Sequence, residues 1–185
     1  WLLKFPREAE LHLKRAAVAD GVEEDRVFLT DKYPFEEHLR VKRAASMLLD
    51  TLEYNAHVSG LDALWAGLPL VTLAGSNMAR RCGASFLQSL GLSCLLARTK
   101  KEYVRIASVL ARSGPNGSQQ HRGTLKRIRA KVEQQRDSSP LFDTNLWVRE
   151  FEVMLRLMWE TADATGQVHG APQPLHLVLS GHTGW

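Results

Sequence analysis

The chain has 185 residues, of which 44% are hydrophobic, so it can bury the core of one domain with appendages. Its formal net charge is only +4, and the modest basic cluster at 121–136 is typical of a solvated helix face rather than of a nucleic-acid site. The longest nearly apolar run, 63–75, is too short to cross a membrane, and the chain opens without a signal-peptide pattern. We therefore expect neither a nucleic-acid partner nor a membrane partner.

The two cysteines, Cys82 and Cys94, lie in apolar surroundings without CxxC or histidine-rich spacing. This spacing argues against a disulfide framework and against a zinc site, and it favours a reducing compartment. The chain begins at Trp1, without methionine and inside a strand-like run. We expect it to be part of a longer protein.

Apolar runs typical of strands alternate with helical patterns along residues 1–112. The expected strands are 1–5, 26–30, 46–50, 68–74 and 93–97. The expected helices are 7–21, 34–45, 60–67, 78–91 and 100–111. Because the strands are largely apolar and joined by short loops, the pattern predicts an α/β fold, a Rossmann-like parallel sheet with helices on both faces.

Beyond this lobe the composition changes. The segment 113–123 is rich in Gly, Ser and Gln, and we expect a flexible loop or insertion. Helical patterns follow at 124–136 and about 144–164, the second with an apolar and aromatic stripe that we expect to pack on this lobe or on a missing partner lobe. The stripe consists of Trp147, Phe151, Met154, Leu155, Met158 and Trp159. The tail 166–185 is expected to be flexible.

The connection that follows the strand 46–50 is longer and more polar than a plain turn requires. It carries a histidine and several small residues before the next helix, and an aspartate follows in the first turn of that helix. In open α/β sheets, ligands bind at the carboxyl ends of the strands, where the free N–H groups of helix N-termini bind anions. There is no GxGxxG and no GxxxxGKS pattern, so neither a dinucleotide site nor a P-loop is predicted.

Individual residues of this connection fit the binding of a phosphorylated sugar. Ser59 and Gly60 are small enough to let a phosphate approach the backbone, and His57 can donate to a phosphate oxygen. Asp62, one turn into the helix, can accept from sugar hydroxyls. A purely local interpretation stays open, with Ser59 as the helix N-cap and Asp62 as the partner of the helix dipole.

A series of motifs gives a more specific indication. They are WLLKFP, EEHLR, LDT, NAHVSGLDALWAGLPLVTLAG, ASFLQSLG, KKEYVRIA and SSPLF. In this order and spacing, over about residues 1–162, they resemble the C-terminal catalytic lobe of the O-GlcNAc transferase family, glycosyltransferase family 41. The resemblance implies the C-terminal lobe of a GT-B glycosyltransferase, a fold in which two Rossmann-like lobes hold a sugar nucleotide in their cleft.

The resemblance also implies an activity and partners. The enzyme would be an inverting glycosyltransferase that moves N-acetylglucosamine from UDP-GlcNAc to serine or threonine hydroxyls of acceptor proteins, without a metal or another cofactor. Its other parts would be an N-terminal catalytic lobe and a superhelix of TPR repeats in the same polypeptide, and its location the cytoplasm, the nucleus or both. The catalytic base and a phosphate-binding lysine are expected upstream of Trp1.

The sugar-nucleotide contacts implied by the resemblance are His38, His57, Val58, Ser59, Gly60 and Asp62. In relatives, the histidine at the position of His38 stacks against the uracil. The residues at His57 and Ser59 lie near the diphosphate, and the one at Asp62 lies at the ribose.

Some residues near these positions depart from the family pattern. Phe35 stands where relatives have a lysine three residues before His38, and Val41 where they have an arginine three residues after it. Val58 replaces a threonine that follows the loop histidine. Each lost charged hydrogen bond is worth about 1–3 kcal/mol, so we expect weaker binding or a changed base preference.

Three alternatives remain. The SPINDLY branch of the same family moves fucose from GDP-fucose; its relatives tend to have a threonine-rich loop in place of NAHVSG and a glutamate in place of Asp62, so the GlcNAc branch is favoured. The second alternative is an inactive scaffold that keeps the fold without binding nucleotide, given Phe35, Val41 and Val58. An unrelated GT-B enzyme such as an epimerase is disfavoured by EEHLR and SSPLF.

Overall fold

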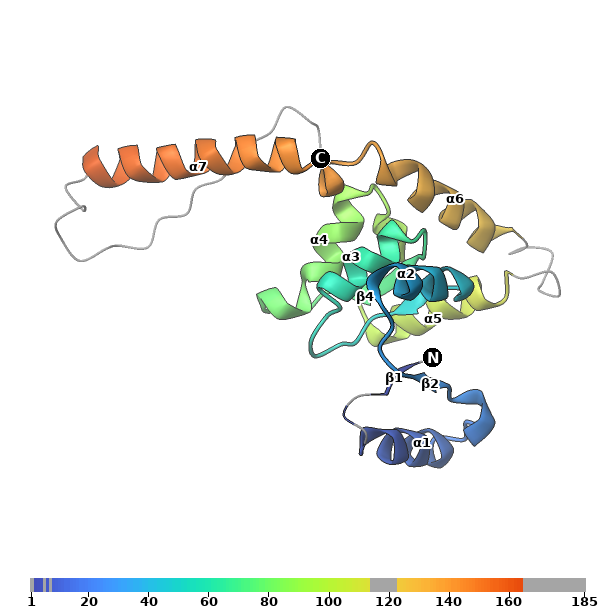
Figure 1. Ribbon diagram of the computed structural model, residues 1–185. Helices are drawn as coiled ribbons and strands as arrows, with labels where there is room; N and C mark the ends of the chain where they lie inside the picture. Colours follow the sequence, from blue (N-terminus) through green and yellow to red (C-terminus); the bar gives the residue numbers. More distant parts are fainter. Residues whose placement is uncertain (1, 5, 7, 114–122, 165–185) are drawn as a thin grey trace.

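The structure is a computed structural model, which describes residues 2–4, 6, 8–113 and 123–164 (Figure 1). The expected loop at 113–123 lies outside the described residues except for its two ends, and the expected tail at 166–185 lies wholly outside them.

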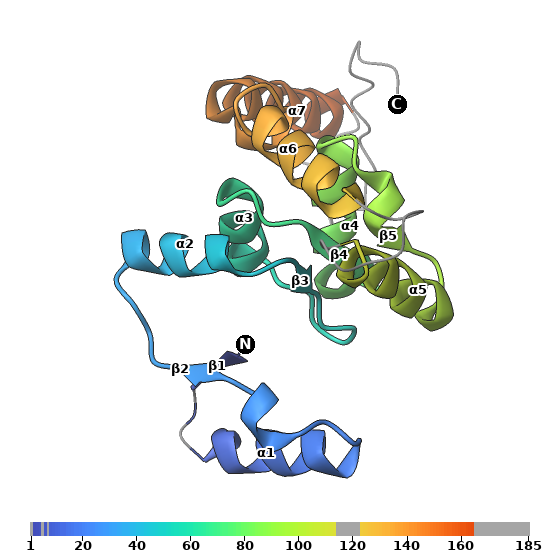
Figure 2. The same cartoon turned by 90° about the vertical axis from the view of Figure 1, so that its right-hand side faces the viewer.

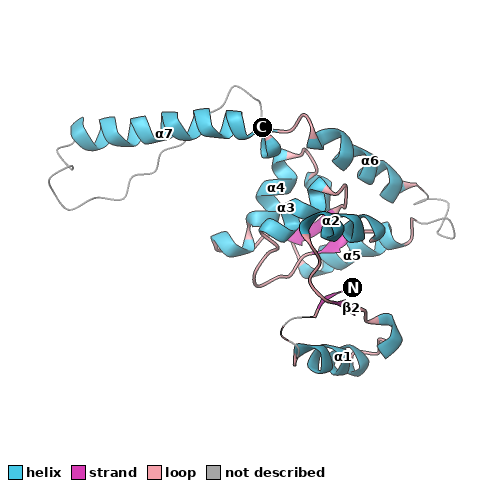
Figure 3. Cartoon of the chain, in the orientation of Figure 1, coloured by secondary structure: helices cyan, strands magenta, loops and turns pink. Residues whose placement is uncertain are grey.

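Strands and helices alternate along the first part of the chain, as the sequence predicts (Figures 1 and 3). The strands are β1 (Leu2–Leu3), β2 (Leu29–Thr30), β3 (Leu48–Leu49), β4 (Leu70–Leu73) and β5 (Leu96–Ala97). The helices are α1 (Ala9–Ala19), α2 (Phe35–Ala44), α3 (Val58–Trp65), α4 (Cys82–Ser89), α5 (Lys100–Ala111), α6 (Thr124–Arg136) and α7 (Thr144–Ala164). Short 3-10 turns include η2 (Met78–Arg80) and η4 (Pro140–Phe142).

The strands pair in parallel, which confirms the predicted α/β class. β1 pairs with β2, and β4 pairs with both β3 and β5. The described strands therefore form two sheets, not the single sheet that we expected.

In Figures 1 and 2, β1, α1 and β2 form an N-terminal unit that lies apart from the rest and is joined to it by residues 31–34. Leu2 and Leu3 are largely exposed, so this unit adds little to the core.

Strand β4 is the centre of the core. Its residues Leu70, Val71 and Thr72 are each 0% exposed. Because successive side chains of a strand point to opposite faces, helices must cover both faces of this sheet. Helices α3, α4 and α5 contact β4, and α6 packs against α3 and α5. The largest buried side chains around it belong to Leu64, Leu68, Leu87, Leu90, Leu92, Leu95, Leu110 and Val132.

The two C-terminal helices differ in their packing. Val132 of α6 is buried, and Arg129 of α6 donates to the Ala45 carbonyl at 2.6 Å, so α6 is fixed to the lobe. Helix α7 has no buried residue, and Trp147 and Trp159 are 59% and 65% exposed. Figure 1 shows α7 projecting from the lobe beyond η4. Its aromatic stripe is uncovered by the described part of the chain.

Gly83 provides a test of packing behind the sheet. A methyl group on Gly83 would lie 2.7 Å from Asp50 Oδ2 and 2.8 Å from Thr72 Oγ1, which is closer than a carbon and an oxygen normally approach. We expect Gly83→Ala to lower the free energy of unfolding by about 1–3 kcal/mol, as measured by urea denaturation. The matched control is Ser85→Ala on the exposed side of α4, which should change it by less than about 0.5 kcal/mol. Equal effects of the two substitutions would contradict this packing.

Candidate functional site

The candidate site lies at the carboxyl ends of β3 and β4. Residues 51–57, which we call the site loop, connect the end of β3 to the start of α3. In open parallel sheets this edge is where ligands bind, because the loops there lead into helix N-termini. The groups that hold the site loop and the first turn of α3 therefore determine the shape of the candidate site.

The buried carboxylate of Asp50 holds the site loop to the sheet. Its Oδ1 accepts from the Ala56 N–H at 2.7 Å, and its Oδ2 accepts from the Thr72 hydroxyl at 2.6 Å. The backbone carbonyl of Asp50 accepts from the Tyr103 hydroxyl at 2.9 Å. Burial, together with the nearby Asp50 charge, raises the pKa of Tyr103 to about 12, so its hydroxyl remains a donor at neutral pH. Asp50 therefore holds both the beginning and the end of the site loop.

Asn55 forms a second anchor inside the loop. Its side-chain amide donates to the Thr51 carbonyl at 2.9 Å, and its backbone N–H donates to the Ala79 carbonyl at 2.8 Å. Its side-chain oxygen accepts a longer bond from the Gly83 N–H at 3.4 Å. Sequence reasoning did not assign Asp50 or Asn55 a binding role; the signal was an acidic residue directly after a strand and an amide residue in the loop that follows.

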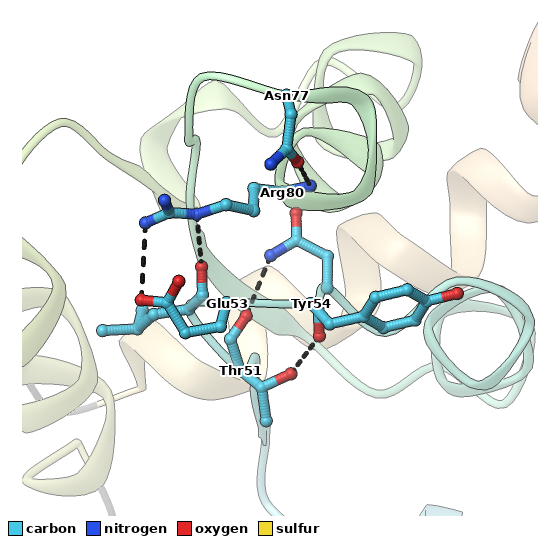
Figure 4. A network of polar contacts seen from close by, with 7 residues as sticks. Thr51, Glu53, Tyr54, Asn77 and Arg80 are labelled. Atoms are coloured by element: carbon cyan, nitrogen blue, oxygen red, sulfur yellow. Dashed lines mark hydrogen bonds and ion pairs between the residues drawn. The ribbon is translucent and has the colours of Figure 1, made fainter.

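The outer side of the site loop is tied to η2 by Arg80 (Figure 4). The Arg80 Nε donates to the Leu52 carbonyl at 2.9 Å, and its guanidinium lies 3.6 Å from the Glu53 carboxylate. Within the loop, the Thr51 hydroxyl donates to the Tyr54 carbonyl. Figure 4 also shows the Tyr54 ring pointing away from Arg80. The loop is consequently held on both sides by hydrogen bonds.

His57 occupies the N-cap position of α3. Its ring stacks on Tyr54 with 4.5 Å between centroids, and its Nε2 lies 3.3 Å from the Ala79 carbonyl oxygen. The predicted start of this helix at residue 60 is wrong, because α3 begins two residues earlier at Val58, and the local alternative with Ser59 as N-cap does not hold either. The tertiary bonds to the loop backbone turn the chain into the helix before it reaches the serine.

The structure brings His38, Ser59 and Asp62 together. The Nε2 of His38, on α2, lies 3.8 Å from Asp62 Oδ2 on α3. Lys42, one turn further along α2, lies 3.6 Å from the same oxygen and donates to the Ser59 carbonyl at 2.7 Å. His57 opens the same helix, but its ring contacts the site loop and η2. The expected contact residues thus lie at the start of α3 or, for His38, beside it on α2. The His57 ring is directed to the neighbouring loop.

The other expected residues have mixed surroundings. Val58 in the first turn of α3 is 71% exposed, and Phe35 at the start of α2 is 64% exposed. Gly60 is buried, and a methyl group on it would lie 3.5 Å from both Ala56 and the Phe86 ring. Both distances are ordinary van der Waals contacts, so the approach of a phosphate to the backbone of Gly60 stays a prediction.

Charge and burial set the protonation of the histidine and lysine at this site. Burial, and then the neighbouring Lys42 charge, lowers the pKa of His38, although Asp62 opposes the shift. Burial also lowers the pKa of Lys42, again opposed by Asp62. A neutral imidazole on His38 is able to stack on an uncharged ring without the cost of desolvating a cation.

A hollow of about 460 Å³ lies elsewhere, where α7 leaves the lobe. It is lined by Trp65, Arg136, Asp137, Ser138, Ser139, Phe142, Asp143, Thr144 and Asn145. Trp65 is the last residue of α3, so this hollow is at the opposite end of the helix from the carboxyl edge of the sheet. We therefore place the candidate site at the start of α3.

Metal and membrane features can be stated for the part of the chain that the structure describes. In residues 2–4, 6, 8–113 and 123–164, no group of three or more His, Cys, Asp or Glu residues is arranged to hold a metal ion. None of the helices in those ranges has both the length and the apolar character that a membrane span needs.

Comparison with known proteins identifies the class to which this fold and site belong. Residues 1–151 match Glycosyl transferase family 41, so the chain belongs to this family. A solved structure of a mutant O-GlcNAc transferase from Thermobaculum terrenum is similar, with a TM-score of 0.75 and 33% sequence identity. The similarity covers 85% of this chain and 29% of that chain.

Curated relatives agree. The UDP-N-acetylglucosamine–peptide N-acetylglucosaminyltransferase of Caenorhabditis elegans is 37% identical over 160 residues, covering 86% of this chain and 13% of the relative. The probable transferase SEC of Arabidopsis thaliana is 34% identical, covering 86% of this chain and 16% of the relative. The SPINDLY protein of Solanum lycopersicum is 31% identical over 123 residues, covering 66% of this chain and 12% of the relative. The chain thus spans a small fraction of the length of these relatives.

The protonation of His38 can be tested directly. We expect its ring to titrate below the ordinary value of 6.5, because burial and Lys42 disfavour the charged form. Since the pKa is lowered on folding, its contribution to stability is complete above pH 6.5 and is lost as the pH falls from 6.5 towards the folded pKa. NMR titration of the ring protons, assigned with His38→Gln, measures this pKa.

Lys42→Met should raise the pKa of His38, because it removes the second cause of the shift. The matched control is Lys101→Met, at an exposed lysine on α5, which should leave it unchanged. A His38 pKa at or above 6.5 in the unsubstituted protein would show that the ring is not desolvated at this site.

Proposed function

We propose that the protein to which this chain belongs is a protein O-GlcNAc transferase, which moves N-acetylglucosamine from UDP-GlcNAc to serine or threonine hydroxyls. Residues 1–112 supply the sugar-nucleotide-binding lobe, and residues 124–165 add helices to it. The observation that carries this proposal is the contact of His38 with Asp62 in the second turn of α3, 3.8 Å apart, in a family 41 chain.

Each residue of the site has a proposed role. His38 stacks on the base, and Asp62 accepts a hydrogen bond from a ribose hydroxyl. The exposed backbone at Val58 and Ser59, in the first turn of α3, faces the diphosphate with its N–H groups. The ring of His57 lies 3.3 Å from a carbonyl oxygen, and we propose that a phosphate oxygen replaces this weak partner when the donor binds.

In the proposed reaction, the acceptor hydroxyl forms a bond to the anomeric carbon as the bond to the diphosphate breaks. Attack from the side opposite the leaving group inverts the configuration at that carbon. The electron pair of the broken bond stays on UDP, and the positive end of α3 stabilises this negative charge. No metal ion is proposed for this step. The base that takes the hydroxyl proton, and a phosphate-binding lysine, are proposed to come from another part of the polypeptide.

The proposed partners follow from the same family. They are the acceptor proteins, a second catalytic lobe and a superhelix of TPR repeats in one polypeptide with this chain. We also propose a location in the cytoplasm, the nucleus or both, where thiols stay reduced. The two free cysteines, Cys82 and Cys94, support this compartment.

A second candidate function is transfer from a different sugar nucleotide. The exposed Phe35, one turn before His38 on α2, and the exposed Val58 at the start of α3 depart from the family pattern, which supports a base other than uracil, and SPINDLY proteins are among the relatives. Incubation of the protein with radiolabelled UDP-GlcNAc or GDP-fucose and a cell extract separates the proposals. Label from UDP-GlcNAc on proteins supports the first function, and label from GDP-fucose supports the second. A protein that binds neither nucleotide is an inactive scaffold.

His57 is the residue whose substitution tests the diphosphate site. We expect His57→Ala to reduce transfer by about tenfold or more, which corresponds to at least about 1.4 kcal/mol of lost transition-state stabilisation. The melting temperature should change little, since the ring is only partly buried and its polar contacts are 3.3 and 3.4 Å long. The matched control is His12→Ala at an exposed position of α1. Unaltered transfer by His57→Ala would leave the N-cap position as the only role of this residue.

The exposed apolar stripe of α7 allows the presence of the proposed second lobe to be tested. We propose that this lobe covers the apolar stripe of α7, because Trp159 is 65% exposed and no α7 residue is buried. Trp159→Ser should then lower the melting temperature of the whole protein by roughly 4 °C or more, while the melting temperature of the chain 1–185 alone should stay the same. Glu160→Gln, at the next exposed position, is the control. A loss of stability in the isolated chain would contradict the proposed partner.

A further inference from the structure

Lys42 is a buried cation inside the candidate site that sequence reasoning did not single out. Its side chain is 7% exposed, although it lies in the last turn of α2. Its ammonium donates to the Ser59 carbonyl at 2.7 Å and lies 3.6 Å from Asp62 Oδ2. One side chain of α2 therefore forms a hydrogen bond to the backbone of α3 and an ion pair with a carboxylate of the same helix.

The burial of this ammonium needs an explanation, because lysine is almost never buried without a partner. Desolvation disfavours the charged form, and the Asp62 carboxylate compensates for it. A neutral side chain at this position would leave Asp62 without the cation that offsets its own partial burial. The two charges at this point are thus mutually dependent.

The two carboxylate oxygens of Asp62 have different surroundings. Lys42 and His38 both approach Oδ2, at 3.6 and 3.8 Å. These contacts draw Oδ2 towards α2, so Oδ1 is the oxygen that we expect to accept from a ligand. A carboxylate held in this way presents an acceptor in a fixed direction, which favours recognition of a hydroxyl over a hydrogen at the same place.

We propose that Lys42 is a positioning residue that gives the donor site its selectivity for ribonucleotides. Its hydrogen bond to the Ser59 carbonyl holds the ammonium beside Asp62, and the ion pair orients Asp62 so that Oδ1 accepts from a ribose hydroxyl. This inference rests on the proposed function, because it assigns a ribose to the ligand of the site.

The test compares nucleotides that differ only in the sugar. Binding of UDP, 2′-deoxy-UDP and 3′-deoxy-UDP to the whole protein is measured by calorimetry. The unsubstituted protein should bind UDP about tenfold or more tightly than at least one deoxy analogue, as expected for a lost hydrogen bond to a charged acceptor. In Lys42→Met, affinity for UDP should fall about tenfold, affinity for that analogue should change less than about twofold, and the selectivity should disappear.

Further variants keep the test decisive. Lys42→Arg retains the cation and should restore part of the selectivity, whereas Lys42→Gln should not. Asp62→Asn alone should abolish the selectivity between UDP and the deoxy analogue. The double variant that also carries Lys42→Met should show no further loss of selectivity. The exposed Lys101→Met is the control. Since selectivity is a ratio measured within one variant, a partly unfolded preparation does not alter it.

Different outcomes overturn different statements. If Lys42→Met and Lys42→Gln weaken the binding of all three nucleotides by the same factor, Lys42 has only a structural role and the inference is wrong. If the unsubstituted protein binds UDP but does not distinguish the deoxy analogues, the ribose contact is wrong while the nucleotide site stands. If the unsubstituted protein binds none of them, the UDP-based function fails, and the inference fails with it.

Discussion

The candidate site depends on one buried carboxylate, that of Asp50, which holds the site loop to the sheet. Asp50 joins the Ala56 N–H of the site loop to the Thr72 hydroxyl at the centre of the sheet. On the other side, Lys42 holds the Ser59 carbonyl. The first turn of α3 is therefore fixed from the sheet and from α2 before any ligand arrives. A site that is ordered in advance loses less conformational entropy on binding, which favours affinity.

Much of the fold could be predicted because its signals are local. Apolar runs predicted parallel strands, and buried β4 shows why no alternation was visible in the sequence. Helices α5, α6 and α7 match the expected ranges 100–111, 124–136 and about 144–164. Local groups set the starts of two of them: the Thr99 hydroxyl caps α5, and left-handed Gly123 precedes α6. Where a boundary is encoded by neighbouring residues, sequence reasoning finds it.

The rest depends on contacts between distant residues. The start of α3 depends on the Ala79 carbonyl, which accepts from the Asn55 N–H and lies 22 residues beyond His57 in the sequence. The division into two sheets depends on which strands pair, and the periodicity of a strand does not specify its neighbour. Lys42 follows the pattern of a solvent-exposed residue near a helix end, and only the packing of α2 on α3 places it beside Asp62.

The anchoring of the site loop also has a consequence for the order of folding. Its partners come from later in the chain: Asp50 and Thr72 are 22 residues apart, Asn55 and Gly83 are 28 apart, and Asp50 and Tyr103 are 53 apart. Contacts of such separation form late, since a long stretch of chain must first be ordered between them. The edge of the sheet that carries the candidate site should thus be among the last regions to order during synthesis, after α5 has emerged from the ribosome. A nucleotide that binds only the completed edge would then draw the folding equilibrium towards the native state.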